Sequence, residues 1–143
     1  MDELNIAKTN IHLVGGVSEG VDAWIVADIL AALPLEAQAQ GVMYVVRDDR
    51  RLEAALEMLA FAVPDATQLK FPAWDCLPYD RVSPRPDIQA ERVAGLSRWL
   101  QGPLSEPRLF VTTVNAFLQK VPPADFFAAG SLVINVGDEL DFD

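Results

Sequence analysis

Four prolines within fifteen residues constrain this chain more than any other feature; they stand at positions 72, 78, 84 and 86. Each fixes its own φ angle, removes a backbone donor and turns the preceding residue away from helix, which argues against helix or central strand from Pro72 to Pro86. The same segment carries side chains that favour burial over disorder: Phe71, Trp74, Leu77, Tyr79 and Val82. The sequence therefore predicts a stiff, ordered loop, long enough that a function is expected of it.

Short apolar runs alternate with helical patterns on both sides of this loop. Strands are expected at 11–14, 42–46, 68–71, 109–113 and 131–136. Helices are expected at 20–33, after an N-cap at Asp48, after an N-cap at Asp87, and at 115–120 and 124–129. Alternation of this kind implies right-handed crossovers, and so an α/β fold with a mostly parallel sheet and helices on both faces.

The spacing of apolar residues also predicts which side of each long helix faces the core. In the first helix this stripe is Trp24, Ile25, Ile29, Ala32 and Leu33, widened by Val26 and Leu30. In the second it is Leu52, Ala55, Leu56, Leu59 and Val63. In the third it is Ile88, Val93, Leu96, Trp99 and Leu100.

The composition is that of one acidic, folded domain. The 143 residues are 51% apolar, with no run near the roughly 20 apolar residues of a membrane helix and no signal-peptide pattern, so a cytoplasmic location without membrane contact is expected. Cys76 and His12 each stand alone, which argues against an internal disulfide or a metal site. With 11 basic against 21 acidic residues, autonomous nucleic-acid binding is not expected, and a basic protein partner suits the surface better.

A glycine-containing turn precedes the first expected helix and invites comparison with a phosphate-binding loop. Against the pattern G-x-x-x-x-G-K-[ST], Gly15 and Gly20 match the glycines, while Val21 replaces the lysine and Asp22 the hydroxyl residue. Valine cannot neutralise a phosphate, and a carboxylate repels one. The turn, Gly15, Gly16, Gly20, Val21 and Asp22, is therefore predicted not to bind nucleotide, its glycines serving only a tight turn.

The proline loop offers a second candidate site. Its rim residues Trp74, Leu77, Tyr79, Asp80 and Arg81 are either a contact patch for a partner or the packing that holds the loop on the sheet. Three aspartates and three arginines nearby are expected to form salt bridges and a helix cap rather than an acid–base pair: Asp75, Asp80, Asp87, Arg81, Arg85 and Arg92. No catalytic group of residues is predicted.

The sequence of this loop resembles that of a known family. The run Trp74-Asp75-Cys76-Leu77-Pro78-Tyr79-Asp80, then Ser83-Pro84 and a helix carrying Glu91-Arg92, is similar to the N-terminal region of the bacterial transcription-repair coupling factor (Mfd). That family has a W-[DE]-x-L-P-Y-[DE]-x-x-S-P stretch before such a helix. Residues 111–122 resemble its next strand and short helix, and residues 131–140 resemble the join into its following domain.

The resemblance implies a RecA-like module of the type of UvrB domain 1a, with a degenerate phosphate loop. It divides the chain into a flexible tail at 1–10, the UvrB-like domain at 11–130 and the truncated start of a UvrA-binding-type domain at 131–143. The parent protein is implied to be an ATP-dependent DNA translocase that displaces stalled RNA polymerase and recruits nucleotide-excision repair through UvrA. The fragment itself is expected to be a scaffold without cofactor, whose partners are the parent's other domains and, through the parent, UvrA and RNA polymerase.

Two other functions stay open at this point. A small nucleotide- or phosphometabolite-binding enzyme domain with an atypical glycine loop would bind nucleotide at residues 15–22. The N-terminal piece of an active UvrB-type helicase would need lysine where this chain has Val21.

Overall fold

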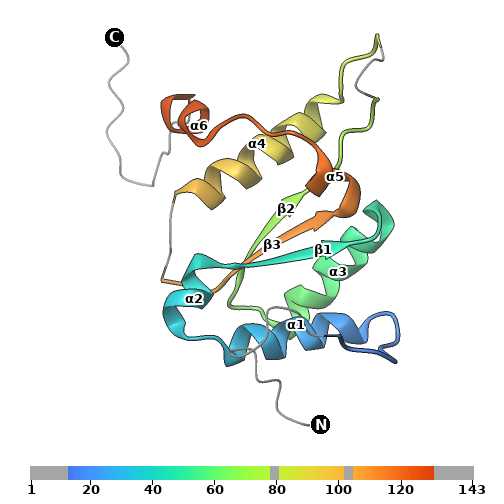
Figure 1. Ribbon diagram of the computed structural model, residues 1–143, viewed down its shortest axis with the longest axis vertical. Coiled ribbons are helices and arrows are strands. Elements are labelled where there is room, and N and C mark those ends of the chain that lie inside the picture. Colours follow the sequence, from blue (N-terminus) through green and yellow to red (C-terminus); the bar gives the residue numbers. More distant parts are fainter. Residues whose placement is uncertain (1–12, 78–80, 102–104, 131–143) are drawn as a thin grey trace.

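A three-stranded parallel sheet forms the centre of the molecule (Figure 1). The computed structural model describes residues 13–77, 81–101 and 105–130. The strands are β1 (Val42–Val46), β2 (Thr67–Phe71) and β3 (Arg108–Thr113), in the order β1-β3-β2. β3 pairs in parallel with both neighbours, Leu109 lying opposite Val42 on one side and Gln68 on the other.

Six helices accompany the sheet in the described residues: α1 (Val21–Ala32), α2 (Leu35–Gln40), α3 (Asp49–Ala62), α4 (Pro86–Leu100), α5 (Val114–Leu118) and α6 (Ala124–Gly130). α1 and α3 lie on one side of the sheet, and α4 and α6 lie on the other (Figure 1). The predicted α/β class, parallel sheet and helices on both faces are confirmed.

β3 is buried along its whole length because helices cover both of its faces. Leu109 and Val111 point into one core cluster, with the inward residues of α1 and α3. Phe110 points into the other, with Phe71 of β2 and with Trp99 of α4. A central strand between two apolar layers is typically a continuous apolar run, and Leu109, Phe110 and Val111 form such a run after Arg108.

Gly95 brings α4 unusually close to β2. A Cβ atom at this position would lie 2.7 Å from the main-chain oxygen of Lys70, closer than any real Cβ sits. The helix therefore rests on the strand backbone, and its inner side follows the spacing Arg92, Gly95, Leu96 and Trp99.

Arg108 ties the ends of two helices to the start of β3. Its buried guanidinium donates from Nε to the carbonyl of Ala39 (2.8 Å) and from Nη2 to that of Gln40 (2.9 Å), at the end of α2. Nη1 donates to the carbonyl of Trp99 (3.2 Å), at the end of α4, and the group lies over the Trp99 ring. A cation is favoured at helix C-termini, where carbonyls lack partners.

Several expectations need correction. Leu13 and Val14 lie in no strand and are exposed, so the strand expected at 11–14 is wrong in its described half. The buried side of α1 is Ala23, Val26, Ala27 and Leu30, while Trp24 is 45% exposed, because small residues let α1 pack against α3. In α4, Val93 and Leu100 are exposed, because each lies one position away from the inward-facing residues that align with Gly95. α2 was not predicted.

The predicted start of α3 is confirmed, and the predicted start of α4 is wrong. Asp48 caps α3 as expected, its carboxylate accepting from the amide of Arg51 at 2.9 Å. α4 begins two residues earlier than expected: Arg85, not Asp87, is the N-cap, and Pro86 is the first helical residue, a position that tolerates proline because its missing N–H has no helical acceptor. The expected tail at 1–10, the strand at 131–136 and the domain start at 131–143 lie outside the described residues.

No helix of the described part is long and apolar enough to cross a membrane.

Replacing Gly95 with alanine tests the close approach of α4 to β2. Helix propensity alone would make the alanine variant more stable by about 1 kcal/mol. Because the new Cβ would meet main-chain atoms of Lys70, we expect a net loss of about 1–3 kcal/mol in the free energy of unfolding, measured by urea denaturation. Ala90→Gly, exposed on the same helix, is the control and loses about 1 kcal/mol by propensity alone. A Gly95→Ala protein more stable than wild type would contradict the described packing.

Candidate functional site

The glycine turn before α1 is the first candidate. Gly16 and Gly20 have positive φ angles of 74° and 103°, which glycine adopts at no steric cost. The amide of Val21 closes the turn on the carbonyl of Ser18 at 3.1 Å. Glycine at positions 16 and 20 therefore suits the shape of the turn, and no strand precedes it among the described residues, which begin at Leu13.

Asp22 occupies the N-terminus of α1 and connects three elements. Its carboxylate accepts from the Gly20 amide (3.0 Å), from the Tyr44 hydroxyl of β1 and from the Arg51 guanidinium of α3. These residues, Gly20, Asp22, Tyr44 and Arg51, are called the Asp22 cluster below. The cluster places a negative charge where a helix N-terminus would otherwise attract an anionic ligand.

The cluster shifts the acidities of its members. Burial alone would raise the pKa of Asp22, but the hydrogen bonds from Arg51 and Tyr44 outweigh it and hold that pKa below its ordinary 3.8. Burial and the bond to Asp22 raise the pKa of Tyr44 to about 12. Arg51, paired with Asp22, has a raised pKa. At neutral pH the cluster is thus a stable ion pair with a neutral phenol, and it offers no group poised to exchange a proton.

The second candidate, the proline loop, is held by a buried arginine. The guanidinium of Arg92 in α4 lies between two aromatic rings, 4.0 Å from the centre of Phe71 and 4.2 Å from that of Trp74. Its Nη1 donates to the carbonyl of Pro72 at 2.5 Å and to Gln119 Oε1 at 3.1 Å. These residues, Phe71, Pro72, Trp74, Arg92 and Gln119, are called the Arg92 cluster.

Gln119 completes this cluster from the segment after α5. Its Oε1 also accepts from the Trp74 amide at 3.1 Å, so one side-chain oxygen connects the loop and the arginine. None of the partners of Arg92 among the described residues is a carboxylate. Burial lowers its pKa to about 10, which still leaves it charged at neutral pH. A charge buried in this way must be hydrogen-bonded, and the loop supplies the acceptor.

The other loop residues divide between packing and exposure. Asp75 accepts from the Arg85 amide at 3.3 Å and Arg85 pairs with Asp87 at 2.5 Å, so part of the expected salt-bridge group is present. Trp74 is half-buried and packs against Arg92, which is the packing role, not the partner-contact role, that was considered for it. Leu77 is 70% exposed and Arg81 is exposed; Tyr79 and Asp80 lie outside the described residues.

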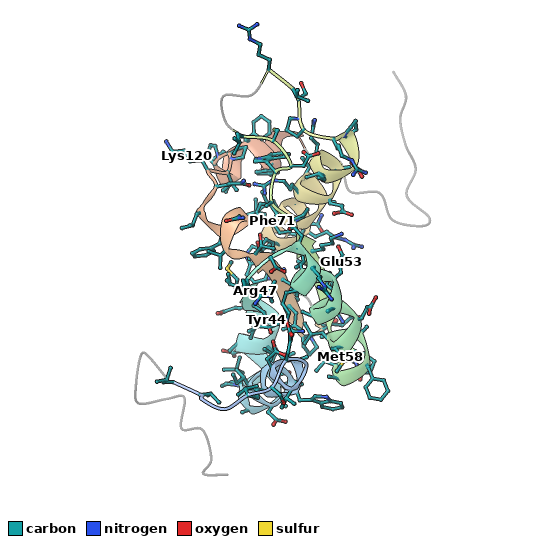
Figure 2. All side chains as sticks on the ribbon, turned by 90° about the vertical axis from the view of Figure 1, so that its right-hand side faces the viewer. Tyr44, Arg47, Glu53, Met58, Phe71 and Lys120 are labelled. Carbon is teal, nitrogen blue, oxygen red and sulfur yellow. The ribbon has the colours of Figure 1, made fainter. Side chains whose placement is uncertain are left out.

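The two clusters lie in different layers of the fold. Tyr44 packs against the core cluster on the α1 and α3 side, whereas Phe71 belongs to the cluster on the α4 side. Figure 2 shows Tyr44 and Phe71 well apart along the long axis of the molecule. The structure therefore does not bring the glycine turn and the proline loop together into one site.

Sequence reasoning missed the role of Arg92 and of Gln119. Arg92 was expected in a salt bridge, yet it binds a carbonyl, an amide and two rings. Its position in the middle of the α4 stripe, three residues before Gly95, was the available signal that it points inward. Nothing local marks Gln119, because its partners are 27 and 45 residues away along the chain.

Two hollows of the described surface are small. One of about 190 Å³ lies between Lys70, Glu91 and Arg98, and one of about 250 Å³ lies beside Thr67, Glu106 and Arg108. Both are below the roughly 300–1,000 Å³ of small-molecule sites, and neither borders the glycine turn. Among the described residues, no group of three His, Cys, Asp or Glu side chains could hold a metal.

Comparison with known proteins gives one consistent family. The chain is 28% identical to the transcription-repair-coupling factor of Haemophilus influenzae over 137 residues, which is 95% of this chain and 11% of that protein. It is 30% identical to the factor of Escherichia coli K12 over 133 residues, 92% of this chain and 11% of that protein. It is 30% identical to the factor of Rickettsia prowazekii over 87 residues, 61% of this chain and 8% of that protein.

These matches confirm the expected resemblance to the N-terminal region of the transcription-repair coupling factor. No protein-family profile matches the chain. The chain spans about a tenth of the length of these relatives.

Changing Asp22 to asparagine tests the Asp22 cluster through its pH dependence. Because the pKa of Asp22 is lower in the folded state, its charge stabilises the fold above the unfolded pKa near 3.8, and this contribution disappears as pH falls through the folded pKa. We expect Asp22→Asn to cost about 1–2 kcal/mol near neutral pH, and this cost to shrink as the pH falls below the unfolded pKa near 3.8, by urea denaturation across pH. Asp28→Asn, exposed on the same helix, is the control. A cost for Asp22→Asn that does not change with pH would contradict the assignment.

Changing Arg92 to lysine tests the Arg92 cluster while keeping the charge. An ammonium group cannot lie flat between two rings and also donate in the guanidinium plane. We expect a loss of about 2–4 kcal/mol in the free energy of unfolding and faster proteolysis within 72–85. Arg98→Lys, exposed on the same helix, should stay within about 0.5 kcal/mol of wild type. Equal stability and equal proteolysis of the two variants would count against the cluster.

Proposed function

We propose that this chain is the N-terminal α/β module of a transcription-repair coupling factor, in which it works as a non-catalytic scaffold. The observation that carries the proposal is the similarity to three such factors across up to 95% of the chain. A parallel three-stranded sheet with helices on both faces suits the expected UvrB-like module.

The Asp22 cluster supports the non-catalytic part of the proposal. A triphosphate at the start of α1 would meet the Asp22 carboxylate, whose hydrogen bonds to Tyr44 and Arg51 hold it in place. An unpaired carboxylate about 4 Å from a phosphate charge would repel it by about 4 kcal/mol at an effective dielectric near 20, and the paired Arg51 guanidinium offsets part of this repulsion. The Val21 side chain, 47% exposed, supplies no compensating donor.

The coupling activity is then assigned to the longer protein. ATP-driven displacement of RNA polymerase and recruitment of repair through UvrA, implied by the resemblance, would be carried by other regions of that polypeptide. This module would orient its neighbours. The exposed rim of the proline loop, Leu77 and Arg81, is the contact surface that we assign to it, with Tyr79 and Asp80 included from sequence.

Titration with ATP and magnesium tests the scaffold role of the 143-residue chain. We expect no heat by calorimetry and no change in melting temperature at millimolar nucleotide. A ligand with a dissociation constant near 100 µM would stabilise the fold by about 1.4 kcal/mol at about 1 mM, so binding would be seen.

A positive control comes from a well-behaved ATP-binding domain measured under the same conditions. Saturable binding to the wild-type chain that Gly20→Arg abolishes would overturn the scaffold proposal. It would favour a nucleotide- or phosphometabolite-binding enzyme domain instead.

A further inference from the structure

Two aromatic side chains lie exposed beside each other on the α1 and α3 side of the sheet. Trp24 of α1 is 45% exposed and Phe61 of α3 is 75% exposed, and their ring centres are 5.9 Å apart in an edge-to-face contact. The core beneath them is filled by other residues of the same helices, which leaves most of the Phe61 ring at the surface. Aromatic side chains are enriched at protein–protein interfaces relative to the rest of a protein surface.

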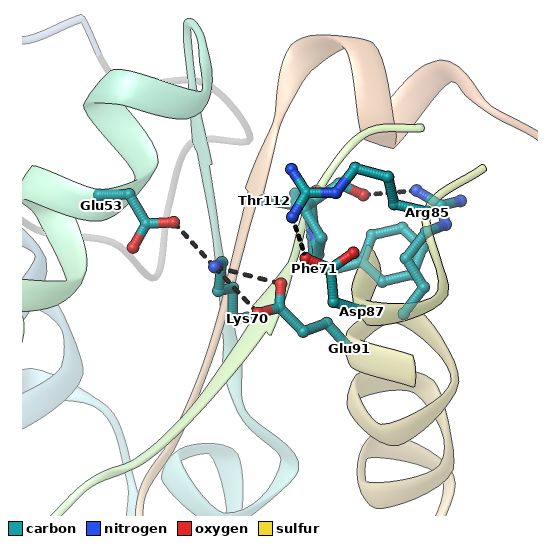
Figure 3. Close-up of polar contacts among 9 residues, drawn as sticks. Glu53, Lys70, Phe71, Arg85, Asp87, Glu91 and Thr112 are labelled. Carbon is teal, nitrogen blue, oxygen red and sulfur yellow. Dashed lines mark hydrogen bonds and ion pairs between the residues drawn. The ribbon is translucent and has the colours of Figure 1, made fainter. Parts of the chain in front are cut away.

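The segments that carry this pair are acidic and contain no basic residue. Residues 21–46 and 52–69 have no Lys, Arg or His, and their six carboxylate residues are Asp22, Asp28, Glu36, Glu53, Glu57 and Asp65. Asp22 is paired with Arg51, and Glu53 is paired with Lys70 at 2.7 Å, as Figure 3 shows. The other four have no ion-pair partner among the described residues.

Two of the unpaired carboxylates lie one helical turn from the rings. Glu57 precedes Phe61 by four residues on α3, and Asp28 follows Trp24 by four residues on α1. Side chains at this spacing are neighbours on a helix surface, and all four are exposed. Each ring therefore has a carboxylate beside it, without a cation from the described part of the chain to neutralise it.

The C-terminus of α3, where Phe61 lies, also lacks a positive charge. The last turn of α3 contains no basic residue, whereas Arg108 donates to carbonyls at the ends of α2 and α4. Because helix C-termini favour cations, a positive group next to Phe61 would be attracted by both the helix dipole and the Glu57 carboxylate.

We propose that the aromatic–acidic surface, made of Trp24, Asp28, Glu57 and Phe61, binds an arginine-containing segment of a separate protein. A guanidinium can lie flat on an aromatic ring while it pairs with a carboxylate through two parallel hydrogen bonds, which an ammonium group cannot do. A nucleic acid is disfavoured, because its phosphates would meet the same carboxylates. The inference goes beyond the proposed function, which assigns no partner to this face.

The size and charge of the surface favour a separate protein over the chain's own ends. A small aromatic centre with a charged rim is typical of interfaces that form and separate, whereas permanent interfaces are larger and more apolar. Residues 1–12 contain one Lys and no Arg, and residues 131–143 contain four carboxylates and no basic residue. Neither end supplies the arginines that the surface would pair with.

Titration with designed peptides tests the surface in the 143-residue chain. The probe is a helical peptide with arginines four residues apart beside leucines, and its controls carry citrulline or lysine in place of arginine. Citrulline keeps the shape of arginine without the charge. By calorimetry at low salt, we expect a dissociation constant for the arginine peptide about tenfold below that of the citrulline peptide and about threefold below that of the lysine peptide.

Matched variants test whether the peptide binds at this surface. Phe61→Ala should weaken binding of the arginine peptide about fivefold, whereas Phe117→Ala, at an exposed site on α5, should not change it. Glu57→Gln should weaken binding about threefold. Asp125→Asn, at an exposed site on α6, changes the net charge equally and should leave the affinity unchanged.

Four results would overturn the inference. One is no binding, and another is equal weakening by the two charge variants, which indicates general attraction to an acidic protein. A third is self-association that Phe61→Ala abolishes, which assigns the surface to a second copy. The fourth is loss of the site in the complete natural polypeptide, where we expect an unchanged affinity. The nucleotide titration does not involve this surface, so each of these results leaves the proposed function standing.

Discussion

A buried guanidinium fixes how the proline-rich segment sits on the sheet. Arg92 lies between Phe71 and Trp74 and donates to the carbonyl of Pro72, so this part of the loop packs around a buried positive charge. Moving such a charge out of water costs several kcal/mol unless its donors are satisfied. The Pro72 carbonyl, the Gln119 amide and the two rings offset that cost, and through Gln119 the same contact holds the segment after α5.

The two candidate sites lie on opposite faces of the sheet. On the α1 and α3 face, Asp22 supplies its own anion to a helix start that could otherwise attract phosphate. On the α4 face, the Arg92 cluster holds Pro72 and Trp74 in place, and Leu77 is exposed. These two features, the paired Asp22 carboxylate and the buried Arg92 guanidinium, are the ones that support the proposed scaffold role.

Local patterns predicted the elements well and the contacts between them poorly. The strands at 42–46 and 109–113 and the Asp48 cap follow from short-range rules and are present. The inner faces of α1 and α4 were predicted only in part. Leu30 and Leu96 face the core as expected, but Ala23 and Gly95, which allow close approach to a neighbouring element, cannot be found from apolar spacing. The electrostatic repulsion assigned to Asp22 could be argued from sequence, but its bonds to Tyr44 and Arg51 join residues 22 and 29 positions away.

The packing of the proline-rich segment depends on the Arg92 charge being held between Phe71 and Trp74. Nitrogen-15 NMR of its guanidinium tests this directly in the 143-residue chain. We expect ring-current-shifted Nη protons that exchange slowly with water and slow rotation about the Nε–Cζ bond, in contrast to the exposed Arg98. Sharp, unshifted and rapidly exchanging Arg92 signals, equal to those of Arg98, would contradict it.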